Sequence, residues 1–450
     1  MQMAMPDLIR VEEAEKGILF QNVDLFAATD ASLVRGMDVF VWEDRIEAVQ
    51  PTGGVVPEGA LVFDGRGRTL MPGLIDAHVH VSGTPAAPWD MFLMDPRSNI
   101  QAFLGAGVTT VVDMGGDAKT AVDIRDAIDS GEVTGPRMYI TGGGPVTAKG
   151  GHPIPALTSI APFPLDHLIA LLVPTVSGPE DARGAVEAVL KHRPDHFKIV
   201  YDSIPDDSPH MTKETLVALI DEAHRVGLPV SVHIGTAQDA VDAVEAGADR
   251  LAHGIYQGEA TPEQLQTIVQ ADVPIIYTAW AFEATGLTAT GTLPATDLDR
   301  LLTPSRALDA VTGKEGSRIL DLDVVGEMAQ TCAQWHDERR RIVGALHDAG
   351  ATILAGSDGP FFGVWGGSAL HHDLEELVAS GFTPGEALLS ATANSARMLE
   401  ENPDYGTVEA GKVADLLLVE GNPLEDIRHS QNIVLVVRAG KLVKLAALHD

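Results

Sequence analysis

The feature that most constrains the fold is an alternation of short apolar runs with amphipathic segments between residues 71 and 404. Most amphipathic segments end in glycine, as Leu216–Val226 does at Gly227, and a glycine there stops a helix. The apolar runs predict eight strands, at residues 74–81, 108–114, 137–141, 196–201, 229–234, 250–253, 273–278 and 351–357. This α/β alternation predicts parallel strands and a (β/α)8 TIM-like barrel, with a doubly wound open sheet as the alternative.

The two ends of the chain have a different pattern of predicted secondary structure from this middle region. Residues 1–70 contain short β runs with tight turns such as Trp42-Glu43-Asp44-Arg45, and β runs return after Gly406. The simplest assembly folds both ends together. We therefore expect a small β-sandwich from residues 1–70 and 405–450, and the barrel over residues 71–404.

Two connections between the predicted strands are long, at residues 142–195 and 279–350. Long excursions inside a compact domain are usually functional loops or lids. The second connection contains a convincing helical stretch from Met328 to His347. The sequence is compatible with two interpretations of this connection, a moving lid and a fixed structural cover over the barrel mouth.

The composition excludes several classes of protein. Hydrophobic residues make up 45% of the 450 residues, which supports a full core. The formal net charge of −33 disfavours nucleic acid and anionic membranes as partners. A single cysteine, Cys332, excludes an internal disulfide framework and a cysteine-based metal site. The sequence shows no signal peptide and no membrane-length apolar run, so we expect a cytoplasmic protein.

Metal-competent side chains gather where the predicted strands end. His78 and His80 lie two residues apart on the first strand, so they share one face. Burying two imidazoles is costly without partners, and a divalent metal ion would supply one. Further polar groups fall on the fourth, fifth, sixth and eighth strands, namely Lys198, His233, His253 and Asp358. Because barrel chemistry gathers at the carboxyl ends of strands, these six groups together predict a metal site.

Lys198 is unusual within this set, because lysine is rarely buried on an apolar strand. The order His-x-His, Lys, His, His, Asp resembles that of the amidohydrolase superfamily. Two segments strengthen the resemblance, at residues 71–80 and 406–416. The sequence is most similar to the branch that contains imidazolonepropionase-like and Xaa-Pro-dipeptidase-like enzymes, and the resemblance covers nearly the whole chain.

The resemblance implies a binuclear site that holds two divalent ions, usually zinc. It assigns His78 and His80 to a buried ion and His233 and His253 to an exposed one. Lys198 would be N-carboxylated and bridge the two ions. Asp358 would bind the buried ion, take a proton from a bridging hydroxide and pass it to the leaving group.

The predicted activity is therefore hydrolysis of an amide bond in a small molecule, of the dipeptide or N-acyl amino acid type. A lactonase or phosphotriesterase on the same site and a non-catalytic scaffold are the alternatives. His152 and Tyr201 are candidate substrate-binding donors. Aromatic residues after the seventh and eighth strands are candidate pocket walls, namely Trp280, Phe282, Phe361, Phe362 and Trp365. By resemblance to relatives, we also expect a homo-oligomer.

Overall fold

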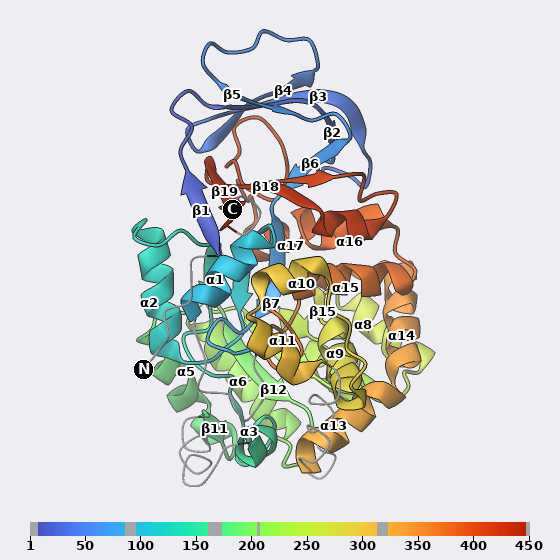
Figure 1. The fold of residues 1–450 in the computed structure, drawn as a ribbon. Coiled ribbons are helices and arrows are strands. Elements are labelled where there is room, and N and C mark those ends of the chain that lie inside the picture. Colours follow the sequence, from blue (N-terminus) through green and yellow to red (C-terminus); the bar gives the residue numbers. More distant parts are fainter. Residues whose placement is uncertain (1–7, 86–95, 161–172, 205–207, 313–322, 447–450) are drawn as a thin grey trace.

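The structure is a computed structural model that describes residues 8–85, 96–160, 173–204, 208–312 and 323–446. Figure 1 shows two regions. Strands from the blue and red ends of the chain lie together at the top, and helices surround a second group of strands below them. The strand β6 (Arg68–Pro72) belongs to the upper region, and β7 (Leu74–Val79) follows it directly into the lower one.

Among the described residues, the two larger parallel sheets of the lower region hold eight strands. One sheet holds β7, β8 (Val108–Asp113) and β9 (Arg137–Ile140). The other holds β12 (Phe197–Tyr201), β13 (Val230–Ile234), β14 (Arg250–Ala252), β15 (Ile275–Tyr277) and β16 (Ile353–Ala355). Each strand falls within one of the eight ranges predicted from the sequence, usually shorter by a few residues. The prediction of an α/β protein with parallel strands is confirmed.

Backbone hydrogen bonds join the two sheets on both sides. On one side, the amide of Asp195 donates to the carbonyl of Ile140 at 2.8 Å. On the other side, the amide of Asp358 donates to the carbonyl of His78 at 2.8 Å, and the amide of His80 donates to the carbonyl of Gly359 at 2.8 Å. The segments that follow β7 and β16 are therefore held against each other. A short parallel pair, β10 (Thr147–Ala148) and β11 (Thr175–Val176), lies in the first long connection.

The helices around these strands begin and end where local sequence signals place them. In α6, the Thr212 side chain accepts from the amide of Thr215 at the start, and Gly227 follows the end with a φ of 81°. Its apolar face, which includes Leu216 and Leu219, is buried. The helices between the strands are α1 (Pro96–Gly105), α2 (Ala118–Asp129), α3 (Ile154–Ile160), α5 (Ala182–Leu190), α6 (Lys213–Arg225), α7 (Ala237–Glu245) and α8 (Pro262–Gln270). Within the described part of the chain, no helix combines the length and apolar character that a membrane span requires.

The second long connection, between β15 and β16, is mainly helical. It contains α9 (Ala279–Thr290), α10 (Asp297–Leu302), α11 (Ser305–Val311), α13 (Asp323–Gln334) and α14 (His336–Asp348). After β16 come α15 (Ser368–Ala379), α16 (Pro384–Ser390) and α17 (Ala393–Leu399). The helical stretch predicted at residues 328–347 is thus present, divided between α13 and α14. The structure does not choose between the two alternatives for this connection, a moving lid and a fixed cover.

Both ends of the chain contribute to one hydrogen-bonded sheet of nine strands, in which β6 pairs with β17. The amino-terminal strands are β1 (Ile9–Glu12), β2 (Ile18–Leu25), β3 (Val34–Trp42), β4 (Arg45–Pro51), β5 (Leu61–Asp64) and β6. The carboxyl-terminal strands are β17 (Leu416–Glu420), β18 (Ile433–Arg438) and β19 (Lys441–Leu445). They share an apolar cluster that includes Phe20, Val39 and Leu416. A short 3-10 helix, η4 (Ile427–Gln431), packs on α15, so this sheet also contacts the helical layer.

Candidate metal centre

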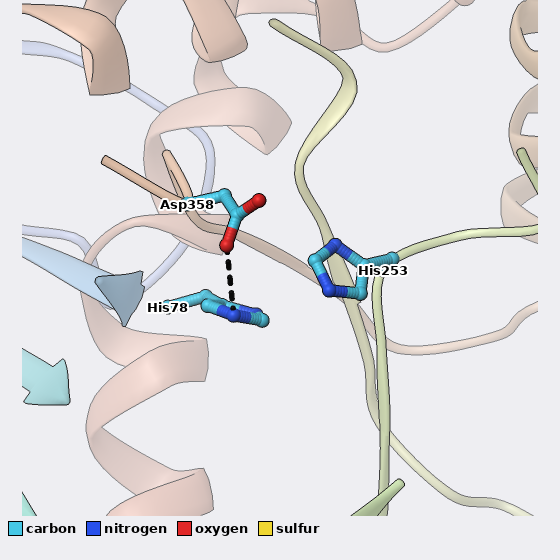
Figure 2. A group of neighbouring side chains, drawn as sticks. All are labelled: His78, His253 and Asp358. Carbon is cyan, nitrogen blue, oxygen red and sulfur yellow. Dashed lines mark ion pairs between the residues drawn. The ribbon is translucent and has the colours of Figure 1, made fainter. Parts of the chain in front are cut away.

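Three of the residues selected from the sequence form a compact donor group. His78, His253 and Asp358 each offer one ligand atom, and these atoms lie within 4.8 Å of one another. Figure 2 shows the Asp358 carboxylate above the ring of His78, with the ring of His253 facing the same space. The Nε2 atoms of His78 and His80 each lie 3.1 Å from Oδ1 of Asp358. The end of β7 and the segments that follow β7, β14 and β16 therefore bring four of the six residues together.

The remaining two residues lie beside this group. The ring of His233, on β13, is 4.1 Å from the ring of His253, measured between centroids. Lys198, on β12, is buried, and its charge is felt by His78, His233 and His253. Five strands, or the turns that follow them, thus contribute imidazole, carboxylate and amine groups to one region of the protein.

Several donor atoms at this centre are buried without a partner. Within the described residues, Nζ of Lys198 and both ring nitrogens of His78 lack a hydrogen bond. His78 lies within ion-pair distance of Asp358, but its ring nitrogen does not have hydrogen-bond geometry toward the carboxylate. Buried polar groups in native proteins almost always have partners. These atoms therefore fit a site completed by an ion.

Burial also sets the protonation of these groups. It lowers the pKa of Lys198 to about 7 and the pKa of His78 to about 3, so both favour their neutral forms. Burial opposes ionisation of Asp358, but the imidazoles of His78 and His253 outweigh it and hold the carboxyl pKa well below its ordinary value. Neutral imidazole and ionised carboxylate are the forms that bind metal ions.

The ring orientations of two histidines are fixed by hydrogen bonds on the far side of each ring. Nδ1 of His80 lies 2.6 Å from the carbonyl of Gly115. Nδ1 of His253 lies 2.7 Å from Oγ1 of Thr278. Metal-bound histidines usually use one ring nitrogen for the ion and the other for such a partner. Nε2 is the nitrogen left for an ion in both residues.

The backbone also departs from strand geometry at two of these positions. His253 has a φ of 67° and Asp358 a φ of 60°, both in the left-handed region. Non-glycine residues rarely adopt this region, and the cost persists only where the surroundings impose it. Both side chains therefore reach the donor group from turns that follow their strands.

A second donor group contains a residue that the sequence reasoning missed. His152, Asp202 and His233 also offer ligand atoms within 4.8 Å of one another. Asp202 follows β12 directly, and its side chain is fully buried. Tyr256, also not selected, donates its hydroxyl to Asp202. Two sequence signals could have identified these residues. Asp202 is a carboxylate directly after a predicted apolar strand, and Tyr256 lies three positions after His253 in the sequence.

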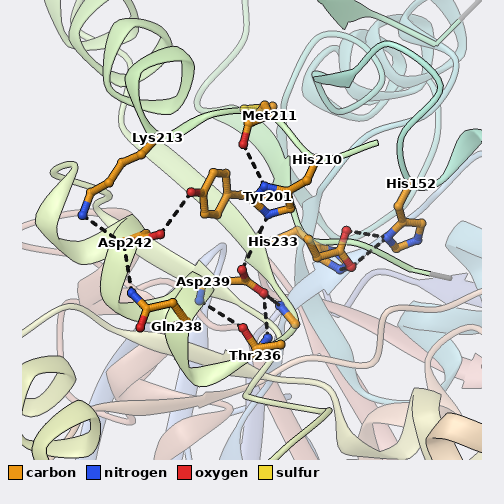
Figure 3. Close-up of polar contacts among 12 residues, drawn as sticks. His152, Tyr201, His210, Met211, Lys213, His233, Thr236, Gln238, Asp239 and Asp242 are labelled. Carbon is orange, nitrogen blue, oxygen red and sulfur yellow. Dashed lines mark hydrogen bonds and ion pairs between the residues drawn. The ribbon is translucent and has the colours of Figure 1, made fainter. Parts of the chain in front are cut away.

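The structure places Tyr201 away from these donor groups. Its hydroxyl donates to Asp242 of α7 at 3.2 Å, and its ring packs 4.3 Å from the ring of His210 (Figure 3). Along β12, Lys198 points to the donor groups and Tyr201 to the outer helical layer, because side chains three positions apart on a strand face opposite sides. This position corrects the expectation that Tyr201 is a substrate-binding donor at the mouth.

The predicted aromatic wall is divided in the structure. Trp280, Phe361 and Trp365 belong to one apolar cluster beside α9, in which Trp365 is fully buried. The ring of Trp280 stacks on His372 at 4.2 Å. Phe282 is instead the aromatic residue at the centre, with its ring 5.7 Å from that of His253 and stacked at 4.3 Å on Tyr256.

Comparison with known proteins agrees with this geometry. The chain matches the model of the amidohydrolase family over residues 69–443. The chain therefore belongs to the amidohydrolase family. This membership confirms the resemblance drawn from the sequence and the prediction of a hydrolase that acts on C–N bonds.

Individual relatives are distant. Ochratoxinase from Aspergillus niger is 26% identical over 410 residues, which cover 83% of this chain and 75% of the relative. Imidazolonepropionase from Anaeromyxobacter dehalogenans is 24% identical over 439 residues, 92% of each chain. The solved structure of a Xaa-Pro dipeptidase with bound methionine aligns with a TM-score of 0.74 at 22% identity, over 95% of this chain and 99% of the other. At this identity, the last likeness establishes the shared fold.

Proposed function

We propose that this protein is a metal-dependent hydrolase that cleaves the amide bond of a small substrate of the dipeptide or N-acyl amino acid type. The observation that carries the proposal is the convergence of histidine, aspartate and a buried lysine without a hydrogen bond, from five parallel strands and the turns that follow them. We also infer that the strands close into a (β/α)8 barrel over residues 71–404. The nine-stranded sheet would then form the small sandwich from the two chain ends.

The proposed ligands are those that the sequence selected. His78, His80 and Asp358 would hold one divalent ion, and His233 and His253 a second, with zinc as the expected metal. The uncharged amine of Lys198 would add to CO2, releasing a proton and forming a carbamate. That anion would serve both ions and would remove the cost of burying a lysine without a partner.

When bound, the ions would supply a water molecule that is deprotonated at neutral pH and a positive charge for the substrate carbonyl. The residues of the chain would then move the proton. Asp358, whose pKa lies well below its ordinary value, stays ionised and accepts the proton of the attacking water. It would then deliver this proton to the departing nitrogen, so that an amine leaves and a carboxylate remains.

Two further residues would contact the substrate. His152 uses Nδ1 for Asp202, so its Nε2 is the nitrogen available to a substrate. Phe282 would form an apolar wall beside His253 and Tyr256. The choice of an amide substrate is supported by the relative described as a Xaa-Pro dipeptidase.

The test combines metal analysis with a substrate panel. We expect purified protein to hold about two divalent ions per chain by elemental analysis. It should hydrolyse dipeptides or N-acyl amino acids faster than lactones or phosphotriesters. His78→Ala should lose both metal and activity, whereas His224→Ala on the exposed face of α6 should lose neither.

Three results would contradict this proposal. Full activity in protein stripped of metal would remove metal dependence altogether. Faster turnover of lactones or phosphotriesters would keep the metal site but replace the amide substrate. Metal without activity on any of these compounds would favour the scaffold interpretation.

A further inference from the structure

The carboxylate of Asp202 accepts several hydrogen bonds in a buried network beside the candidate metal centre. Nδ1 of His152 lies 2.9 Å from both carboxylate oxygens of Asp202. Nε2 of His233 lies 2.9 Å from Oδ2, and the hydroxyl of Tyr256 donates to the same oxygen. A single carboxylate therefore restrains one proposed metal ligand, one proposed substrate contact and the tyrosine that packs on Phe282.

The contacts of Asp202 differ in kind from those of Asp358. The ring nitrogens of His152 and His233 have hydrogen-bond geometry toward Asp202. The ring of His78 lies at a similar distance from Asp358 without that geometry. A ring N–H directed at a carboxylate cannot at the same time present a lone pair to an ion. Around Asp202 the nitrogens act as donors, whereas around Asp358 the ligand atoms remain available.

This difference determines which nitrogen of His233 is free. With Nε2 committed to Asp202, Nδ1 is the remaining nitrogen of that ring. His80 and His253 show the reverse arrangement, because their Nδ1 atoms are committed to Gly115 and Thr278. A carboxylate behind a metal-bound imidazole fixes its tautomer and orientation and makes it a better ligand.

We propose that Asp202 is a positioning residue that holds His233 with Nδ1 toward the second ion and His152 with Nε2 toward the substrate. This inference rests on the proposed function and extends it by coupling metal binding to substrate binding through one side chain. The carboxylate of Asp202 accepts hydrogen bonds from both imidazoles and from the hydroxyl of Tyr256, so all three side chains are held against one buried group.

The competing interpretation is an additional ion held directly by His152, Asp202 and His233, whose ligand atoms are close enough for one. The hydrogen-bond geometry favours positioning. Tyr256 and His152 also donate to the oxygen that His233 uses, so Oδ2 already accepts hydrogen bonds from three donors. The two interpretations differ in the effect of removing His152, which is a metal ligand only in the second.

The experiment titrates metal-free protein with Zn²⁺ and determines the number of ions bound and the dissociation constant of each. For Asp202→Asn, we expect the first ion to bind as in the wild type and the second about 10- to 100-fold more weakly, with excess Zn²⁺ restoring occupancy. His152→Ala should keep both affinities and lower kcat/KM. The matched control is Asp242→Asn, which alters the carboxylate on Tyr201 and should change neither constant.

Tyr256→Phe gives a second, milder measurement, which decides the question if Asp202→Asn does not fold. Loss of one hydrogen bond to Asp202 should weaken the second ion by about 3- to 10-fold and leave the first unchanged. Unchanged affinity for the second ion in whichever of these variants folds would overturn the inference.

Other outcomes separate this inference from the proposed function. Three ions in the wild type, with one lost in both Asp202→Asn and His152→Ala, would establish the direct site and overturn positioning. Equal weakening of both ions in Asp202→Asn would show a general structural role and overturn it as well. If the wild type binds no Zn²⁺, the proposed function and the inference are both overturned. If the wild type binds two ions and the variants bind them with the same dissociation constants, the inference alone is overturned.

Discussion

Two polar clusters lie toward opposite ends of the parallel strands, and they differ in whether their charged groups have partners. At the amino end of β9, Asp415 accepts from Arg137 at 3.2 Å and from Arg438 at 3.0 Å. The amide of Ala439 donates to the same carboxylate at 2.7 Å, and the guanidinium of Arg137 lies over the ring of Tyr405. Every charge in this cluster has a partner within the chain.

In the cluster at the carboxyl ends of the strands, several buried polar groups have no hydrogen-bond partner among the described residues. Lys198 is buried without a hydrogen bond among the described residues, and His78 has neither ring nitrogen satisfied. Burial of both groups shifts their pKa values toward the neutral forms. A paired buried cluster can hold a structure together by itself, whereas an unpaired one costs stability unless a ligand completes it. The comparison assigns a structural role to one end of the strands and a functional role to the other.

The largest expected effect tests the functional role of the carboxyl ends of the strands, through the substitution Asp358→Asn. The amide cannot accept a proton as the carboxylate does, so we expect kcat to fall about 10²- to 10⁴-fold on the best amide substrate. Thermal unfolding should change little, since this end of the strands is not where charges are paired. A stability loss without a kinetic defect would reverse the roles of the two clusters. Elemental analysis of the variant separates lost proton transfer from lost metal.

The opposite end is tested by Asp415→Ala, which leaves two partly buried arginines without their carboxylate. We expect the free energy of unfolding in urea to fall by about 3 kcal/mol, with metal content and KM unchanged. Asp64→Ala is the matched control, because Asp64 pairs with Arg66 on the exposed surface. That control should have no measurable effect. Equal stability of the two variants would show that the buried network is not structural.

The smallest expected effect concerns Lys198→Met in protein freed of metal and CO2. The pKa of Lys198 is about 7 in the folded chain because burial disfavours the charge, and about 10.4 in the unfolded chain. Between these values the unfolded state binds more protons, so the metal-free wild type loses stability as the pH falls from 10 toward 7. Methionine removes this penalty, and we expect the variant to be about 1–3 kcal/mol more stable near pH 7.

Denaturant unfolding at pH 7, 8 and 9 measures this difference. The gap between the variant and the wild type should narrow as the pH rises. A constant gap would indicate a packing effect rather than a charge. A variant less stable than the wild type would show that Lys198 has a partner that the buried cluster does not reveal.

The sequence predicted the strands and the side chains at their ends for a local reason. Whether a short apolar run forms a strand depends mainly on its own residues and the turns beside it. His78, Lys198 and His233 lie within such runs, so alternation along the strand placed them on the inner face. His253 and Asp358 follow their strands with positive φ, so only their proximity to the strand ends was predictable.

The contacts of the residues beyond the strands were not predictable in the same way. Alternation turns Tyr201 and Asp202 to different layers, but it does not specify their partners. Asp202 contacts His152 and His233, and Tyr201 contacts Asp242, all of them in other segments of the chain. Phe282, rather than Trp280 or Trp365, lies beside His253 because of how α9 packs after β15. These outcomes depend on loop paths and helix rotations that no local pattern specifies.

The sequence by itself therefore determined the α/β class, the positions of the strands and the six side chains of the candidate metal centre. Only the tertiary structure decided that a shared carboxylate, Asp202, joins His152 to His233, and that Asp415 pairs with both Arg137 and Arg438 at the amino end of β9. The physical reason is the distance along the sequence over which the deciding interactions act. Strand formation and side-chain alternation are set by neighbouring residues, whereas the partner of a buried charge is set by chain segments that meet only when the protein has folded.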